Sequence, residues 1–384
     1  MTCSAGAVAL ARSLRCRRRT CSRSSSDTAR RWMDRESSMG AYEAAEQYAH
    51  DVFDRPRQAI AALIRCDPQE VAIVSSATQA WQAVVYGMEF KPGDVIVTAP
   101  AEYGSNYLTY VQLKQRFGIE IAVCPEDAGG DLDLQELDRL LQDPGCKLLS
   151  FSHIPTSSGR VYDAAGAGAV ARRRGGPFVL DACQTAGQIP IDVANIQCDF
   201  LTATGRKYLR APRGCGFLYA SHAAMQWHKP ATLDVWGAVL TDDEGYELQP
   251  SARRYEQYEM SFAARVGLGV AADEAVDALQ NGAWDRIQEL AQYLRERLAG
   301  VPGVAVHDVG KQLCGIVSFT LQGRDAEEVK MDLRARGINV SVSRWTSTML
   351  DFRTRGLESV LRASVHYYNT RGDIDKLVAA LTDA

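Results

Sequence analysis

Residues 202–217 read TATGRKYLRAPRGCGF, and they place Lys207 in a loop of small residues that also carries three arginines. Such a cluster can be a solvated basic loop. It can also be a site for a phosphorylated ligand, because small residues let the backbone approach an anion closely. A lysine that has lost its proton can act as a nucleophile. The sequence on either side of the loop decides between these interpretations.

Short apolar runs without alternation, separated by segments of helical periodicity, begin near residue 42. Examples are DPQEVAIVSS (67–76), PGDVIVTAP (92–100), PFVLDAC (177–183) and CDFLTATG (198–205). This pattern predicts an α/β fold with a mostly parallel sheet that is covered on both faces. Towards the C-terminus the pattern changes to that of a smaller α+β domain. We therefore expect a large domain at 39–270 and a small domain at 271–384.

The composition is that of an ordinary globular protein. The chain has 384 residues, 46% of them hydrophobic and 23% charged, with a net charge of -4, so neither a nucleic-acid nor a membrane-surface partner is expected. No apolar run is long enough to span a membrane. The ten cysteines form neither CxxC nor a zinc-like spacing, so we expect no metal site and a reduced, cytoplasmic protein. Residues 1–38 are rich in Arg and Ser, and we expect a poorly ordered or atypical N-terminal segment there, with a targeting segment as the alternative.

Chemically useful residues follow the predicted strands, where such sheets bind their ligands. Asp181 ends one strand, Gln184 follows one turn later, and Lys207 lies 26 residues after Asp181. Asp181 can be a helix N-cap or the partner of a cationic ring nitrogen. The junction around Ala77 and Thr78 can be a simple helix start or a seat for an anion.

Tyr103 follows another strand end, where it can be a packed aromatic or a ring that stacks on a cofactor. A lysine for a Schiff base, an aspartate for a pyridinium, a phosphate seat and a stacking ring are together what pyridoxal 5'-phosphate (PLP) requires.

From about residue 40 to its end, the chain resembles fold type I PLP enzymes of the aminotransferase class V group. That group includes cysteine desulfurases, isopenicillin N epimerases and the ergothioneine-pathway C–S lyase. The resemblance rests on SSATQA (75–80), AEYGSN (101–106), LDACQTAGQIPID (180–192), TATGRKYLRAPRGCGFLY (202–219) and RASVHYYNT (362–370). The resemblance implies PLP as the cofactor, an amino acid as the substrate, and a homodimer.

The resemblance also implies a role for each candidate residue. Lys207 would form the Schiff base, Asp181 would keep the pyridine nitrogen protonated, and Gln184 would donate to the phenolic oxygen. Lys207, once released, would be the catalytic base at Cα. The remaining candidates would bind phosphate (Ala77, Thr78, Thr204), lie against the ring (Tyr103, Thr156) or clamp the substrate α-carboxylate (Arg362). The alternative for Arg362 is an internal salt bridge.

Two departures from the desulfurase pattern bear on the reaction. The loop SVSRWTSTMLD (341–351) contains no cysteine, although desulfurases carry their reactive cysteine there, and Arg206 stands in place of a histidine. A persulfide requires a thiolate, so we expect β-elimination of the C–S lyase type from a cysteine-derived substrate. Aminotransfer and epimerisation remain alternatives.

Overall fold

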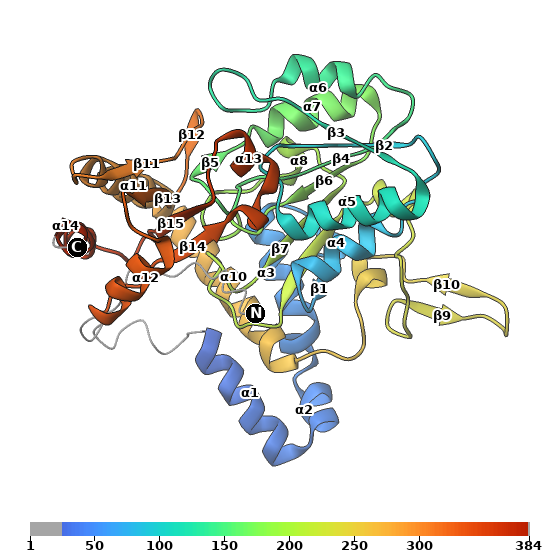
Figure 1. Ribbon diagram of the computed structural model, residues 1–384. Coiled ribbons are helices and arrows are strands. Elements are labelled where there is room, and N and C mark those ends of the chain that lie inside the picture. Colours follow the sequence, from blue (N-terminus) through green and yellow to red (C-terminus); the bar gives the residue numbers. More distant parts are fainter. Residues whose placement is uncertain (1–24, 383–384) are drawn as a thin grey trace.

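The computed structural model describes residues 25–382, and its centre is a seven-stranded sheet (Figure 1). The strand order is β1-β8-β7-β6-β4-β2-β3. The pairs β2–β3, β2–β4, β4–β6 and β6–β7 are parallel, and β8 is antiparallel to both of its neighbours. The strands are β1 (Val71–Val74), β2 (Val95–Thr98), β3 (Glu120–Val123), β4 (Cys146–Ser152), β6 (Phe178–Asp181), β7 (Phe200–Thr204) and β8 (Gly216–Ala220). The predicted α/β fold is confirmed.

Helices cover both faces of this sheet, and successive strand residues point to opposite faces. In β6, Phe178 and Leu180 join one hydrophobic core, whereas Val179 joins the other. The first face is covered by α3 (Arg55–Ile64), α6 (Leu134–Leu140), α7 (Ala164–Arg174), α8 (Val193–Ile196) and α10 (Phe262–Gln280). The second is covered by α4 (Ala77–Val85), α5 (Gly104–Phe117), α9 (Ala224–Trp227) and the 3-10 helix η4 (Ala252–Tyr255). Burial on both faces explains why the strands read as continuous apolar runs.

The C-terminal part forms a second, antiparallel sheet with the order β11-β13-β15-β14. Its strands are β11 (Val304–Val306), β13 (Ile316–Leu321), β14 (Ser341–Arg344) and β15 (Ser359–Ser364), and its helices are α11 (Ala283–Ala299), α12 (Ala326–Ala335), α13 (Met349–Thr354) and α14 (Arg371–Thr382). Leu361 and Ala363 of β15 join the core that α11, α12 and α14 cover. Because side chains alternate along a strand, Arg362 points to the opposite face.

The two parts of the chain are joined by α10 and by a small sheet. Residues of α10 as far as Ala275 pack in the core of the large domain, so the predicted boundary at 270/271 falls inside this helix. The two-stranded sheet pairs β5 (Arg160–Val161) with β12 (Gln312–Leu313). This pairing ties the C-terminal domain to the loop that follows β4.

The predicted N-terminal segment divides into two parts. Residues 1–24 lie outside the described residues, whereas most of the remainder forms α1 (Ser25–Met39), a helix that the sequence did not predict. Trp32 of α1 is 1% exposed and packs with Val52 and with Val266 of α10. The helix was missed because the Arg- and Ser-rich composition outweighed its amphipathic pattern, in which Trp32 is the one buried apolar residue. The chain continues through α2 (Ala41–Gln47), the π-helix η2 (His50–Asp54) and the 3-10 helix η3 (Pro68–Glu70).

Between residues 25 and 382 no helix has both the length and the apolar character needed to cross a membrane.

Candidate active site

The carboxyl ends of the parallel strands bring the predicted site residues to one edge of the large sheet. The strand register aligns Ser152 at the end of β4 with Asp181 at the end of β6, and Asp181 with Thr202 of β7. The loops after these strands carry Thr156, Gln184 and Lys207. Residues that lie far apart in the sequence therefore become neighbours, as expected for a sheet of this type.

Lys207 is buried and faces the ring of Tyr103. Its Nζ lies 5.7 Å from the ring centroid, and the side chain is 7% exposed. Burial lowers the pKa of Lys207; Cys183 and Asp181 oppose this shift, and Arg206 and Arg362 add to it. A lowered pKa increases the fraction of neutral amine, which is the nucleophilic and basic form.

Asp181 is a buried carboxylate without a cation. Its Oδ1 accepts a hydrogen bond from the backbone N–H of Cys183 at 2.8 Å, and its Oδ2 accepts one from Nδ2 of Asn106 at 3.1 Å. Turns rather than a helix follow it, so Asp181 is not a helix N-cap. Within residues 25–382 no Lys, Arg or His nitrogen lies within 4.0 Å of its carboxylate oxygens. Burying a carboxylate that has no direct ion pair is costly, and the protonated nitrogen of PLP is the kind of group that would form one.

The start of α4 forms a seat for an anion. Ser76 is the N-cap and accepts the backbone N–H of Gln79 at 3.1 Å. The N–H groups of Ala77 and Thr78 in the first turn have no acceptor within the helix, and the positive end of the helix dipole favours a phosphate there. The strand register pairs Gly216 of β8 with both Val74 of β1 and Thr204 of β7, which brings Thr204 to this seat.

Gly216 keeps this seat open. A Cβ at this position would lie 2.5 Å from the carbonyl oxygen of Ala203 and 3.3 Å from the amide nitrogen of Ala77. The first separation is shorter than van der Waals contact allows, so only glycine fits without a shift of the strand or of the seat.

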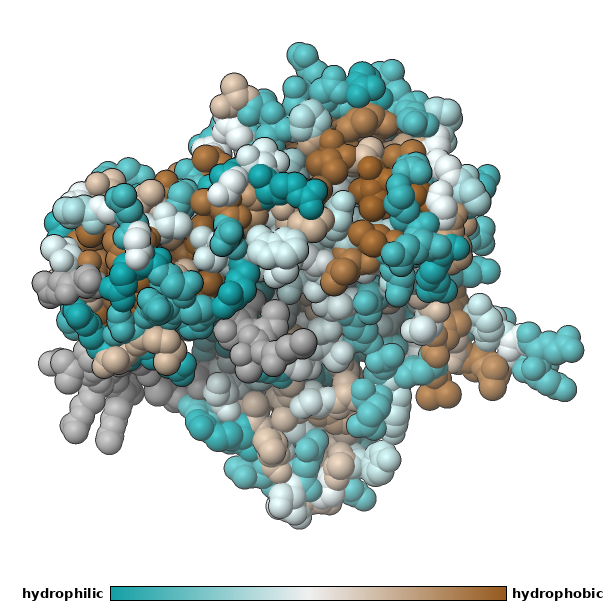
Figure 2. All heavy atoms as spheres, viewed as in Figure 1, coloured by the Kyte–Doolittle hydropathy of each residue, from teal (hydrophilic) through white to brown (hydrophobic). Residues whose placement is uncertain are grey.

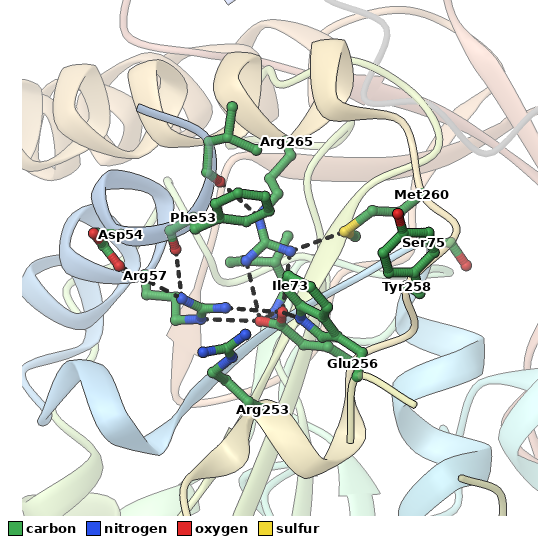
Figure 3. Close-up of polar contacts among 12 residues, drawn as sticks. Phe53, Asp54, Arg57, Ile73, Ser75, Arg253, Glu256, Tyr258, Met260 and Arg265 are labelled. Carbon is green, nitrogen blue, oxygen red and sulfur yellow. Dashed lines mark hydrogen bonds and ion pairs between the residues drawn. The ribbon is translucent and has the colours of Figure 1, made fainter. Parts of the chain in front are cut away.

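A buried ion cluster lies against β1, the strand that precedes the seat (Figure 3). Glu256 accepts hydrogen bonds from Arg57 at 2.9 and 3.0 Å, from Arg265 at 3.1 and 3.3 Å, and from the backbone N–H of Ile73 in β1 at 2.8 Å. Burial would raise the pKa of Glu256, but the charges of Arg265 and Arg57 lower it. The next residue, Gln257, bonds to Gln79 of α4. The segment after η4 is thereby fixed to both β1 and α4.

Arg362 reaches from the small domain to the loop after β4. Its Nη1 donates to Oγ1 of Thr156 at 2.7 Å and to Oγ of Ser343 at 3.4 Å, while its Nε has no partner. No Asp or Glu among residues 25–382 forms a salt bridge with it, although the side chain is 3% exposed. The internal salt bridge considered above is therefore not seen. A buried guanidinium with a free donor fits a substrate carboxylate.

Gln184 also has a free polar atom at the site. Its Nε2 donates to Oγ1 of Thr156 at 3.4 Å, and its Oε1 has no partner. The two ends of an amide exchange by a simple flip, after which Thr156 would donate to Oε1. Nε2 would then be free to donate to a phenolic oxygen. Four features of the site fit PLP and an amino acid substrate. They are the unpartnered atoms of Gln184 and Arg362, the free amides of α4, and the carboxylate of Asp181, which has no direct ion pair.

Sequence reasoning missed two residues of this site, Glu102 and Asn106. Both are buried and hydrogen-bonded to each other, and Asn106 also bonds to Asp181. Their position in the sequence could have indicated them, because both lie within the AEYGSN stretch, on either side of Tyr103.

Several known proteins are similar to this chain in sequence and fold. A probable cysteine desulfurase of Methanothermobacter thermautotrophicus is 27% identical over 334 residues, covering 85% of this chain and 82% of the relative. The apo cysteine desulfurase of Thermococcus onnurineus superimposes with a TM-score of 0.85 at 22% identity, covering 93% of this chain and 91% of that one. The cystine C–S lyase C-DES, solved with its product cysteine persulfide, gives a TM-score of 0.82 at 22% identity, covering 94% and 93%.

Residues 31–377 match the sequence profile of the family described as Aminotransferase class-V. The match spans the sheet, the lysine loop and the small domain that carries Arg362. The chain therefore belongs to the aminotransferase class-V family and is a PLP-dependent enzyme.

Proposed function

We propose that this enzyme cleaves the C–S bond of a cysteine-derived amino acid by β-elimination. A substrate of the form RS–CH2–CH(NH3+)–COO− would lose its Cα proton and its thiolate, and water would then release pyruvate and ammonium. The thiol RSH leaves with the proton, so no oxidant or reductant is needed.

The observation that carries the proposal is the convergence of Lys207, Asp181 and Arg362 on one buried site. PLP, when bound, supplies an electron sink for the Cα–H bond. Lys207, with its lowered pKa, would remove the Cα proton. Arg362 would bind the α-carboxylate, and Asp181 would receive the ring nitrogen. The phosphate would be held by Ala77, Thr78 and Thr204. Tyr103 would lie against the cofactor ring, and Thr156 and Gln184 would lie at the edge of that ring.

The cysteines support a route without an enzyme persulfide. The segment 341–351 contains no cysteine. It folds into part of β14, the 3-10 helix η5 (Trp345–Ser347) and the start of α13. Thr348 donates to Ser157 at 2.8 Å, and the N–H of Asp351 donates to the carbonyl of Pro100 at 3.1 Å, so the segment is fixed to the large domain. Cys314 is fully buried, which raises the pKa of its thiol to about 12 and disfavours the thiolate.

The relatives support the substrate class. Several are named cysteine desulfurases or probable cysteine desulfurases, and C-DES is named a cystine C–S lyase. Both names describe cleavage of a C–S bond in cysteine or cystine.

The test is a product assay with cysteine, cystine and cysteine S-conjugates. We expect release of pyruvate and ammonia in equal amounts, together with a thiol, persulfide or sulfide. Lys207→Ala should abolish both this release and the visible absorbance of lysine-bound PLP, and Lys229→Ala, at an exposed lysine, should change neither. Keto-acid formation with accumulation of pyridoxamine phosphate would instead identify an aminotransferase, and inversion at Cα an epimerase.

We further propose a homodimer, because a hairpin with exposed apolar residues stands away from the body of the molecule (Figures 1 and 2). It consists of β9 (Ala238–Leu240) and β10 (Tyr246–Leu248), and Val239 and Leu240 are 58% and 77% exposed. Light scattering should give twice the chain mass, and a monomer that binds PLP fully would contradict this. A cytoplasmic location is also part of the proposal, supported by the seven unpaired cysteines among the described residues.

A further inference from the structure

A second buried carboxylate, Glu102, lies behind Asp181 and has no part in the chemistry described so far. It is 2% exposed, at the end of the loop that follows β2. No Lys, Arg or His among residues 25–382 forms a salt bridge with it. A buried acid without a cation costs stability, so its hydrogen-bond partners have to account for its presence.

Five donors surround the Glu102 carboxylate. Oε1 accepts hydrogen bonds from the backbone N–H of Tyr103 at 2.5 Å, from Oγ of Ser152 at 2.7 Å and from Nδ2 of Asn106 at 3.1 Å. Oε2 accepts the hydroxyls of Tyr110 at 3.1 Å and Thr98 at 3.3 Å. These hydrogen bonds favour the ionised form and offset part of the cost of burying it.

Asn106 connects Glu102 to Asp181. Its Nδ2 donates to Oε1 of Glu102 and to Oδ2 of Asp181, both at 3.1 Å. An amide nitrogen has two hydrogens, and here each carboxylate receives one. The opposite orientation would place the amide oxygen against two carboxylate oxygens, so the network also fixes how Asn106 points.

The second oxygen of Asp181 is also fixed, because it accepts the N–H of Cys183 at 2.8 Å. Asp181 is thus held at both oxygens, with its remaining lone pairs available to the site. The charges of the two acids act on each other: burial raises the pKa of Glu102 to about 7, and the charge of Asp181 adds to this shift. Bringing a cation to Asp181 relieves the repulsion between the two carboxylates.

We propose that Glu102 is a positioning residue for the cofactor. Through the amide of Asn106 it holds Asp181 in the orientation that receives the ring nitrogen of PLP, and its negative charge adds to that of Asp181 in keeping this nitrogen protonated. The inference rests on the proposed role of Asp181 and assigns a function to a residue outside direct contact with the cofactor.

The test compares the affinity of the cofactor-free, full-length protein for two ligands, PLP and 1-deazapyridoxal 5'-phosphate. The analogue has a C–H in place of the ring nitrogen and otherwise the same aldehyde, hydroxyl and phosphate groups. The ratio of the two Kd values, measured by equilibrium dialysis at pH 7.5, therefore reports the interaction with the ring nitrogen alone.

Glu102→Gln should reduce the preference for PLP over the analogue by about tenfold or more, which corresponds to about 1.4 kcal/mol. PLP should bind more weakly, and the analogue should bind equally well or more tightly. Glu102→Asp keeps the charge and should keep most of the preference, even if both ligands bind more weakly. Asp131→Asn, which neutralises a buried acid in the loop after β3, is the matched control and should leave both affinities unchanged.

Tyr110→Phe provides a second, milder variant in case Glu102→Gln does not fold. Loss of its hydroxyl removes one donor from Glu102, which makes the ionised form less favourable, and the preference for PLP should fall in the same direction. An unchanged preference, or equal weakening of both ligands, would show a purely structural role for Glu102 and overturn the inference. If the unsubstituted protein binds neither ligand, the proposed function itself is wrong.

Discussion

Nη1 of Arg362, in the small domain, donates a 2.7 Å hydrogen bond to Oγ1 of Thr156, which lies 206 residues earlier in the loop after β4 of the large domain. This bond joins the two domains at the site where the substrate carboxylate is expected. Because Thr156 also contacts Gln184, a single hydroxyl connects the proposed carboxylate clamp to the proposed cofactor contacts. The arrangement leaves Nε of Arg362 free for a ligand.

Arg362→Lys should raise KM by roughly 30- to 150-fold, because a bidentate charged contact is worth about 2–3 kcal/mol and lysine lacks the planar fork. The melting temperature and the cofactor absorbance should change little, because Arg362 has no ion pair to lose. Steady-state kinetics and thermal melting measure the two effects. Arg295→Lys is the matched control, since Arg295 is paired with Asp308 at 2.8 Å: it should lower the melting temperature and spare KM. The reverse pattern would remove Arg362 from the site.

The stability of the cofactor-free protein should depend on pH through Glu102. Burial raises the folded-state pKa to about 7 from an ordinary value of 4.5. Between these values the folded protein retains a proton that the unfolded chain has released, so this group's contribution falls as pH rises and is constant above about 7. Glu102→Gln removes the slope, and relative to the unsubstituted protein it should gain on the order of 3 kcal/mol between pH 4.5 and pH 8. Denaturant melts at several pH values measure this gain, and a constant difference would contradict it.

Gly216→Ala should weaken PLP binding and destabilise the protein. The added methyl would lie 2.5 Å from the carbonyl oxygen of Ala203 and 3.3 Å from the amide of Ala77, so either β8 or the phosphate seat must move. Overpacking of this kind costs about 1–3 kcal/mol. Gly176→Ala is the control because a Cβ there meets nothing within 4 Å. Reconstitution with PLP and thermal melting of both variants test the expectation, which fails if the two variants behave alike.

Glu256→Gln should destabilise the fold by about 3–5 kcal/mol, because it removes the carboxylate that the buried guanidinium groups of Arg57 and Arg265 share. The loss should appear as a lower denaturation midpoint. Glu274→Gln, which breaks the more exposed pair with Arg210, should cost about 1 kcal/mol or less. An equal loss of unfolding free energy in the two variants would show that the Glu256 cluster does not hold the segment behind the phosphate seat.

The sequence by itself determined the parallel sheet and the residues at its strand ends. The features that allowed this are local: apolar runs such as PFVLD, the helix start at Ala77, and the spacing of Asp181, Gln184 and Lys207. Each can be interpreted from the neighbouring residues alone. Burial on both faces of a sheet produces continuous apolar strands, and parallel strands place their carboxyl ends at one edge. The sequence alone is therefore enough to assign Lys207 and Asp181 to one edge of the sheet.

Only the tertiary structure decided which side chains touch. The pairing of Glu102 with Asp181 through Asn106 depends on the order of β2, β4 and β6 and on their register, and no short stretch of sequence encodes either. Contact between Arg362 and Thr156 requires the small domain to dock on the large one. The helix α1 is held by Trp32 against α10, more than 200 residues away, so its attachment depends on a contact that only the folded chain provides. In each case the free energy comes from burial and hydrogen bonding between distant segments, which exist only once the chain has folded.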